Sequence, residues 1–574
     1  MDYVPSDEEV LQTIACLGEE ECELELYRKE IAERRRELKI MERREKALRD
    51  NVARRRSVIS AQRKFPVEIW QIIFSMVCLA SDYSLEINNE DDSFPPPPVT
   101  KLPVTLSHVC TRWRDIADSS PGLWSTISVT FHNLRPMNVA LLERFLINSG
   151  NHSLRVRIKR PAGSLLLGND ERALKMVASQ FLRAEHLVVD MEGFGLDRPI
   201  TFPNLTMYKE EGTILIADSH WRQALRGAPS LRIATIIRLF SSSSLPYQQL
   251  STLNIVNIRP TDLQLLSRIL PTCQKLESLS IGCNILLQEG ATIDLAPVEL
   301  RSLRTLVIHD HITWKLDLTT TFLQRVLAMD TPMLTSLLAS LRTPALETIE
   351  LQCGDWEQSR QWPSALIGLL QRSSKTLSKI SLRVAACTDA VNKSRTLSAL
   401  LSEVPNLTCL GLDLAWFGRI GGGMRDYGCD TDWSDWLISE LFSKLGNTEE
   451  YPDLAPNLTT VSFRMSDVVF CESEVHHSDM FYRKHDVLRK VLGAAAKRSP
   501  TSIARQSPPV GLRRPLTDIR VVRILCSDVG WPPVKEGLVP RPVALDHLSL
   551  GEIESIGEAG VRIAVEEVGE IVEW

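Results

Sequence analysis

A short apolar pattern recurs along most of the chain and constrains its fold more than any other feature of the sequence. In each copy an aliphatic residue is followed, three and five positions later, by two further apolar residues. Weaker copies begin at Ala184 and Leu231. The clear copies are Leu250/Leu253/Ile255, Leu276/Leu279/Ile281, Leu303/Leu306/Ile308, Leu346/Ile349/Leu351, Leu377/Ile380/Leu382, Leu407/Leu410/Leu412, Leu458/Val461/Phe463 and Leu545/Leu548/Leu550.

The spacing of these copies predicts a solenoid. Most consecutive copies begin about 26 to 31 residues apart, and a few longer gaps indicate insertions. The last two apolar positions of a copy are two residues apart, so on a strand both side chains enter one core. Turn sequences such as Val404-Pro405-Asn406 precede the copies, and helical patterns lie between them. This alternation is typical of leucine-rich repeats, in which parallel strands line the inner side of a curved array.

The array is expected to occupy residues 131–574. Residues 137–160 predict a helix followed by a strand, in which apolar residues alternate with Arg155 and Arg157. Two insertions interrupt the array: 416–451 is acidic and rich in tryptophan, and 494–515 is basic and rich in proline and serine. The acidic segment 552–574 fits a cap on the last repeat.

Partner binding by such an array would fall to the residues between the core positions, because these face out of the inner sheet. Their composition is mixed and mostly neutral, without a basic stripe for a phosphorylated motif or a nucleic-acid backbone. The pattern therefore does not identify a binding partner. The candidate substrate-binding residues are Thr305, His309, Glu350, Gln352, Lys379, Arg383, Asp413 and Arg464.

Upstream of the array, residues 64–126 contain two amphipathic helical patterns. Pro66 suits the first turn of a helix, and aliphatic residues then recur three and four positions apart up to Val77. A second pattern runs from Leu106 to Ala117 and includes Trp113. Helices this short have only marginal stability by themselves. Their apolar stripes are also wider than the contact between two helices can bury. We therefore expect part of this apolar surface to contact something else.

This stretch resembles an F-box. The resemblance rests on the opening Phe65-Pro66-Val67-Glu68-Ile69, on the run from Val109 to Arg114, and on Leu123-Trp124. With the preceding charged helix, the chain is similar to a large fungal F-box-like family. An F-box-like domain is expected over 61–130, with two departures: Phe65 replaces the usual leucine, and an insert at 81–103 with four consecutive prolines is expected to be disordered. An ordinary helical hairpin is the alternative.

The resemblance implies a non-catalytic substrate receptor of a cullin-type (SCF) E3 ubiquitin ligase. The F-box would bind a Skp-type adaptor and through it a cullin, while the array would hold the substrate near the ubiquitin-charged partner. Two other classes stay open: an adaptor-bound scaffold without a ubiquitin role, and a repeat interaction protein whose F-box has decayed. The adaptor-binding residues implied are Phe65, Pro66, Ile69, Ile73, Phe74, Val77 and Trp113.

The N-terminal region predicts a flexible segment over 1–18 and a charge-dense helix over 19–60. Leu24, Ile31 and Leu38 lie seven residues apart, which is the spacing of a coiled-coil seam. Arg34 and Glu45 interrupt the seam. One interpretation is a weak dimer through 24–52. The other is a single solvated helix that packs its thin apolar stripe on the next module.

The composition excludes several other classes. A formal net charge of −6 gives no electrostatic reason to expect that the chain binds nucleic acid. The cysteines form no C-x-x-C pair, which argues against a zinc ribbon and a disulfide framework and fits a reducing compartment. No run approaches the roughly 18 apolar residues of a membrane span, and the N-terminus lacks a signal pattern. The expected location is therefore the cytoplasm, the nucleus or both, without a membrane partner.

The sequence offers no catalytic constellation. His309-Asp310-His311 and His476-His477 lack the surrounding ligands of a zinc site, and neither a G-x-S-x-G elbow nor a kinase motif set is present. Cys110 is expected to be a buried small hydrophobe. No catalytic residue, metal or cofactor is predicted. The expected fold is mixed α and α/β: a coiled-coil-like helix, a small helical domain, and a curved solenoid of parallel strands and helices.

Overall fold

A computed structural model of the chain falls into two compact units. The first contains Met1–Ser81 and Leu102–Ser120, and the second contains Asp82–Lys101 and Pro121–Trp574. They are described separately. The structure describes residues 6–59, 65–88, 99–161, 166, 168–190, 200–211, 219–239, 245–259, 262–283, 295–310, 332–352, 361–373, 375–385, 390–415, 440–441, 443–445, 450–451, 454–467, 518–525, 562–567 and 570–573.

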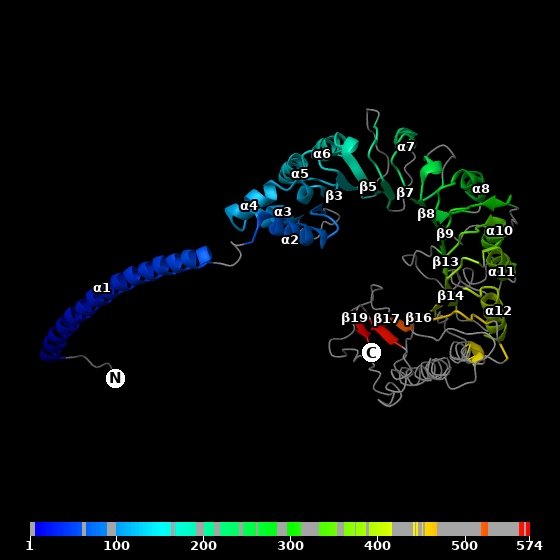
Figure 1. The fold of residues 1–574 in the computed structure, drawn as a ribbon. Coiled ribbons are helices and arrows are strands. Elements are labelled where there is room, and N and C mark those ends of the chain that lie inside the picture. Colours follow the sequence, from blue (N-terminus) through cyan, green and yellow to red (C-terminus); the bar gives the residue numbers. More distant parts are fainter. Residues whose placement is uncertain are drawn as a thin grey trace. The chain divides into compact units, whose positions relative to one another are not determined.

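The first unit begins with one long helix, α1 (Asp7–Ile59) (Figure 1). It starts in a capping box, in which the Ser6 backbone N–H donates to the Glu9 carboxylate at 2.9 Å and the Glu9 N–H donates to the Ser6 hydroxyl at 3.4 Å. The flexible segment expected over 1–18 is therefore wrong from Asp7 onward. This capping signature was present in the sequence and marks the start of the helix.

The apolar seam of α1 is exposed along its length. Leu24, Ile31 and Leu38 are each about half exposed, so the stripe does not pack on the next module as one interpretation required. Val10 and Leu17 extend the seven-residue spacing upstream and are also exposed. The weak dimer through this helix stays a prediction.

Three short helices complete the first unit: α2 (Val67–Leu79), α3 (Leu102–Ser107) and α4 (Thr111–Asp118). The second helical pattern was expected to be continuous, but Cys110 is extended, with φ −160° and ψ 170°. α3 ends at Ser107 and Cys110 caps α4, so the pattern forms two helices.

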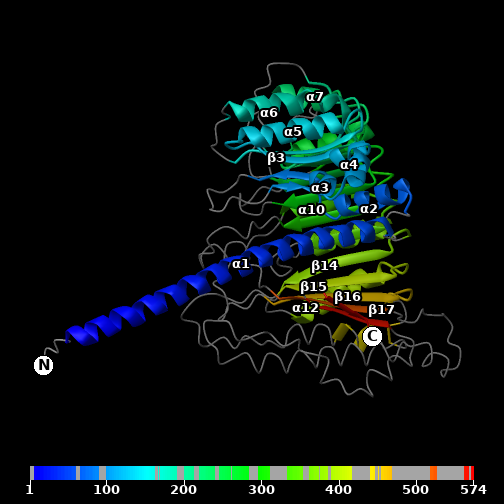
Figure 2. The same ribbon diagram turned by 90° about the vertical axis from the view of Figure 1, so that its left-hand side faces the viewer.

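The second unit is built on one long sheet (Figures 1 and 2). In the described part of the chain it contains seventeen strands. Their bounds are β1 (Leu85–Ile87), β2 (Thr100–Lys101), β3 (Thr126–Thr130), β4 (Leu154–Lys159), β5 (Ala184–Asp190), β6 (Met207–Glu210), β7 (Ile233–Ile236), β8 (Thr252–Ile258), β9 (Ser278–Cys283), β11 (Thr305–Asp310), β13 (Thr348–Gln352), β14 (Lys379–Ala385), β15 (Cys409–Ala415), β16 (Thr460–Asp467), β17 (Asp518–Leu525), β18 (Arg562–Glu567) and β19 (Glu570–Glu573).

The sheet is parallel from β3 to β18, with each strand beside the next in chain order. β1 pairs parallel with β3 and antiparallel with β2, and β19 pairs antiparallel with β18. A separate two-stranded pair joins β10 (Val298–Glu299) to β12 (Leu341–Arg342). The expected series of parallel strands is therefore present.

Helices cover one face of this sheet (Figure 1). The core lies between the two layers: Ile349 and Ile380 on the strands line the same interior space as Leu366 and Leu397 on the helices. No described helix is both long and apolar enough to cross a bilayer. The helices are α5 (Pro136–Asn148), α6 (Asn169–Ala178), α7 (Ser219–Arg226), α8 (Leu263–Ile269), α10 (Pro332–Ser340), α11 (Gln361–Ser373) and α12 (Ala390–Ser402).

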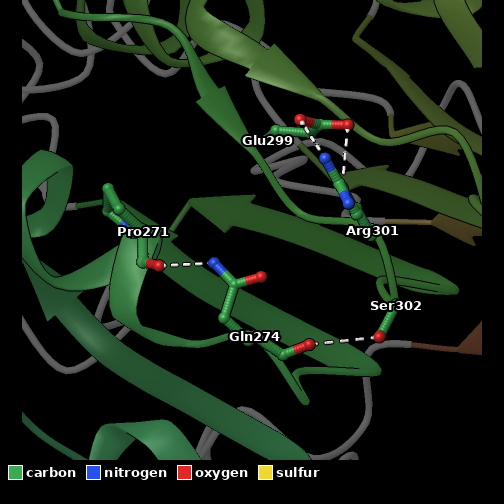
Figure 3. Close-up of polar contacts among 5 residues, drawn as sticks. All are labelled: Pro271, Gln274, Glu299, Arg301 and Ser302. Atoms are coloured by element: carbon green, nitrogen blue, oxygen red, sulfur yellow. Dashed lines mark hydrogen bonds and ion pairs between the residues drawn. The ribbon is translucent and has the colours of Figure 1, made fainter.

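Side-chain hydrogen bonds tie the turns before several strands to the preceding repeat. In each case the residue directly before the first apolar position donates to a backbone carbonyl one repeat upstream. In Figure 3 the Ser302 hydroxyl donates to the Gln274 carbonyl at 3.1 Å, while the Gln274 amide donates to the Pro271 carbonyl at 2.6 Å. Equivalent bonds run from Asn204 to Leu182 at 2.9 Å, from Ser230 to Pro203 at 3.0 Å, from Asn406 to Lys375 at 3.0 Å and from Asn457 to Pro405 at 2.9 Å.

Most predicted copies form strands, and several strands, among them β6 and β17, were not predicted. The clear copies from Leu250 to Leu458 and the weaker ones at 184 and 231 all lead into strands. β6 was missed because Glu210 occupies a core position, where it accepts hydrogen bonds from the Tyr208 hydroxyl at 3.1 Å and the Ile237 N–H at 3.0 Å. β17 lies within the longest gap between predicted copies.

Other expectations are corrected or lie outside the described residues. The insert 81–103 was expected to be disordered, but it contains β1, β2 and the start of α3. Its segment 89–98 lies outside the described residues, as do the copy at Leu545 and the whole of 494–515. Of the insertion 416–451, only 440–441, 443–445 and 450–451 are described.

Gly282 is required where two strands approach closely. The register of β8 and β9 shifts between Ile255 and Ile258, and a Cβ on Gly282 would overlap the Val256 carbonyl oxygen and lie 2.8 Å from its carbon. We expect Gly282→Ala to lower the free energy of unfolding by about 1–3 kcal/mol, because the backbone must move. Urea denaturation measures this. Gly227→Ala is the matched control, since its Cβ would lie 3.5 Å from the nearest atom; equal stability of the two variants would contradict the prediction.

Candidate functional site

Helix α2 has two apolar faces of different character. Its inward face consists of Trp70, Phe74 and Cys78, which are four residues apart and buried. Phe74 has no exposed surface at all. Pro66, with φ −54° and ψ 156°, precedes the first turn, where its missing N–H costs no helical hydrogen bond. The large aromatic side chains therefore form the interior of this small unit.

Trp113 of α4 packs against this inward face. Its ring centroid lies 4.9 Å from that of Trp70 and 4.9 Å from that of Phe74. Phe65 extends the cluster through an edge contact with Trp70 at 6.0 Å. Tilted and edge-on aromatic pairs at such distances are favourable beyond the surface they bury. This cluster joins α2 to α4.

Two arginines hold the ends of these helices in place. The Arg112 guanidinium donates to the Phe65 carbonyl at 2.6 Å, and the Arg114 guanidinium donates to the Ser107 carbonyl at 3.2 Å. These bonds link α4 to the segment before α2 and to the last residue of α3. Cys110, expected to be buried on a helix face, is instead exposed as the residue that caps α4.

The outward face of α2 is aliphatic and exposed. Met76 is 66% exposed. Val109, which precedes α4, is also exposed. Exposed apolar side chains gathered on one helix face make that face a candidate interaction site. We call this outward face the aliphatic face; its residues are Ile69, Ile72, Ile73, Met76, Val77 and Leu79.

The residues implied as adaptor contacts divide between these two faces. Phe65, Pro66, Ile69, Ile73 and Val77 are exposed. Phe74 is buried and Trp113 is half-buried, so both hold the unit together and Phe74 is not available to a partner. Ile72, Met76 and Leu79 belong to the same surface but were not among the implied contacts, although their spacing from Ile69 was visible in the sequence.

The candidate substrate residues lie on five neighbouring strands, in three rows of the register. Thr305 shares a row with Lys379 through the intervening β13, and His309 pairs with Gln352. Arg383, Asp413 and Arg464 are successive register partners. Thr305, His309 and Glu350 are half-buried, and Lys379 is exposed. The side chains of Gln352, Arg383, Asp413 and Arg464 lie outside the described part.

A basic cluster lies on the same face of the sheet at its other end and was absent from the candidate list. On β4 the buried residues Leu154, Val156 and Ile158 alternate with half-buried Arg155, Arg157 and Lys159. Lys209 of β6 lies in the register row of Arg157, with Val188 between them. The alternation at 154–159 was seen in the sequence but was used only to predict the strand. We name Arg155, Arg157, Lys159 and Lys209 the basic cluster.

Neighbouring groups fix the positions of these charges. The guanidinium carbons of Arg155 and Arg157 lie 5.3 Å and 6.0 Å from the ring centroid of buried Tyr83. Burial raises the pKa of Tyr83, while the two arginines oppose that shift. Glu211 contacts Arg157 at 2.5 Å and Lys209 at 2.7 Å. Although burial alone would raise it, the pKa of Glu211 is lowered by these two cations.

Metal-ligating side chains do not gather in the described part of the chain, where no group of three or more His, Cys, Asp or Glu could hold an ion. His309 is on β11, whereas His311, His476 and His477 lie outside the described residues.

No family model and no curated protein matches the chain. Among solved structures it is similar to the crystal structure of the leucine-rich repeat-containing protein LegL7 from Legionella pneumophila. The match has 14% sequence identity and a TM-score of 0.29, and it covers 64% of this chain and 98% of LegL7. A likeness at this level carries no argument about fold or function.

Loss of the Trp113 ring should loosen the helical unit selectively. We expect Trp113→Ala to destabilise α2–α4 by about 2–4 kcal/mol, below the cost for a fully buried tryptophan because the ring is half-buried. Hydrogen exchange of peptides from α2 and α4 should rise, while exchange in β8–β16 should not change. Trp113→Phe, which keeps an aromatic contact, is the control. Unchanged exchange in α2 for the alanine variant would contradict the packing role.

Thiol labelling should separate exposed from buried cysteines. Burial raises the pKa of Cys78 and of Cys273 to about 11, so both stay protonated at pH 8. Cys16, Cys22 and Cys110 are exposed. At pH 8 we expect an alkylating reagent to modify these three at least about tenfold faster than Cys78 and Cys273, because the thiolate is the reactive species. Peptide mass spectrometry measures the rates, and a fully unfolded sample, in which all five should react alike, is the control.

Proposed function

We propose that this chain is the non-catalytic substrate-recognition subunit of a cullin-type (SCF) E3 ubiquitin ligase. In this proposal the aliphatic face of α2 binds a Skp-type adaptor, which links the chain to a cullin. The repeat array binds a protein substrate. The proposed location is the cytoplasm, the nucleus or both.

The observation that carries the proposal is the division of α2 into a buried aromatic face and an exposed aliphatic one. The width of the apolar stripes in the sequence predicted apolar surface beyond the needs of a helical pair. The helices bury Trp70, Phe74, Cys78 and Ile116 and leave aliphatic side chains such as Ile69 exposed. Burying such side chains against a partner contributes roughly 1.5–3 kcal/mol each at most. A helix in this state favours a hydrophobic protein partner.

The array would then position the substrate and take no part in the chemical reaction itself. Its strands present rows of polar side chains over a continuous apolar core, an arrangement suited to holding another protein. A receptor that holds a substrate beside a reactive partner accelerates transfer through proximity and orientation. No side chain of this chain is assigned a step in that transfer.

A non-catalytic repeat scaffold without a ubiquitin role is the alternative function. The repeat array by itself supports this alternative equally well, because stacked repeats commonly serve as protein-binding surfaces. The two proposals differ in whether a cullin is recruited through the aliphatic face of α2.

Adaptor binding tests the proposal directly. We expect the purified full-length chain to capture a purified Skp-type adaptor, and Ile69→Glu with Ile73→Glu to reduce that capture at least about tenfold, since two carboxylates would enter an apolar contact. The matched control is Met137→Glu with Ile147→Glu. Both of those residues are exposed apolar side chains on α5 of the second unit, so the variant adds the same charge elsewhere.

Three results would be informative. Capture by wild type and by the α5 variant, but not by the α2 variant, supports the receptor. Capture of the adaptor without recruitment of a cullin added to the same mixture supports the scaffold. Absence of capture by a folded wild-type protein would overturn the receptor proposal.

A further inference from the structure

The basic cluster stands out against the rest of the chain. The whole chain carries a formal net charge of −6, yet β4 presents three cations on one face and β6 adds a fourth. Two carboxylates offset part of this charge: Glu211 pairs with Arg157 and Lys209, and Asp190 is the register partner of Lys159. Glu86 of β1 is one further carboxylate in the row of Arg157, separated from it by Ser128. A net positive surface remains.

The cations are held in place before any partner arrives. Arg155 and Arg157 stack on Tyr83, which is 5% exposed and therefore cannot move away from them. Stacking keeps the planar guanidinium groups oriented while their N–H groups stay able to donate. The field of Arg155 also reaches the adjacent strand: burial lowers the pKa of His186, and Arg155 lowers it further against the opposing effect of Glu185.

The spacing of the cluster matches an extended peptide. Arg155, Arg157 and Lys159 occupy alternate positions of one strand, so their side chains leave the sheet about 6.6–7 Å apart. An extended peptide with a carboxylate at every second residue presents charges at the same interval. Arginine guanidinium groups bind carboxylates through two parallel hydrogen bonds, which adds geometric selectivity.

We propose that the basic cluster binds an acidic, extended segment of the partner protein, with carboxylate side chains at alternate residues. A nucleic-acid backbone fits less well, because Glu211 and Asp190 interrupt the positive surface and no basic track continues along the strands from β8 to β13. The inference rests on the proposed function only in assigning partner binding to the array. It does not require the adaptor.

A peptide-binding assay tests this inference. The probe is a fluorescein-labelled peptide in which glutamate alternates with glycine, added to the full-length chain at low ionic strength and followed by fluorescence anisotropy. The same peptide with glutamine in place of glutamate is the ligand control. We expect binding of the glutamate peptide alone, weakening as salt is raised, because exposed charges are screened.

Variants with opposite expected effects make the test independent of misfolding. Arg155→Gln with Lys159→Gln should weaken binding about tenfold or more, since charge-assisted hydrogen bonds are lost. Lys275→Gln with Arg301→Gln removes the same charge from exposed turn positions and should bind like wild type. Glu211→Gln should strengthen binding about two- to fivefold, because Arg157 and Lys209 lose an internal competitor.

Several results would overturn the inference. They are equal binding of the glutamate and glutamine peptides, wild-type affinity in the Arg155/Lys159 variant, and weaker binding by a folded Glu211→Gln variant. Displacement of the peptide by single-stranded DNA at a lower concentration would assign the cluster to nucleic acid instead. The assay contains no adaptor, and the Arg155/Lys159 variant should still capture it. Failure of the peptide inference and failure of the receptor proposal are thus distinguishable.

Discussion

The hydrogen bond between equivalent backbone positions of successive repeats is the constraint on which the array depends. The residue after the first apolar position of each repeat donates its backbone N–H to the backbone carbonyl of the equivalent residue one repeat upstream. The distance from nitrogen to oxygen is 2.8 Å from Glu347 to Arg304 and 3.0 Å from Thr459 to Thr408. Those two bonds span 43 and 51 residues of chain, and the equivalent bond from Thr408 to Ser378 spans 30, yet its length of 2.8 Å is alike. Insertions therefore leave the ladder intact and must be accommodated between the strands.

This ladder of hydrogen bonds also determines which strand residues enter the core and which face away from it. Once the register is held, alternate residues enter the core and the rest face the other side. Core positions accept few exceptions, and Glu210 shows the cost of one: its carboxylate needs donors from Tyr208 and from the Ile237 backbone to remain buried. The opposite face carries no such requirement. Charge can accumulate there locally, as it does on β4, without disturbing the stack.

The sequence predicted the repeating part well because the same three apolar positions return with each strand. It failed where a local exception breaks the pattern, as at Glu210, or where a strand lies in a long gap, as with β17. The helix start at Ser6 could have been predicted from its capping box, and the basic face of β4 from the alternation that predicted the strand. The strand β1 could not, because its three residues gain their place only by pairing with β2 and β3.

The candidate site shows a different limit. Ile73 and Phe74 are adjacent and both apolar, so the pattern of α2 alone cannot say which one faces inward. The choice depends on Trp113, far away in the sequence, whose ring fits against Trp70 and Phe74. Filling the interior with aromatic rings leaves the aliphatic residues outside. A sequence motif that lists both kinds of residue therefore mixes two roles, holding the unit together and contacting a partner, which only the packing separates.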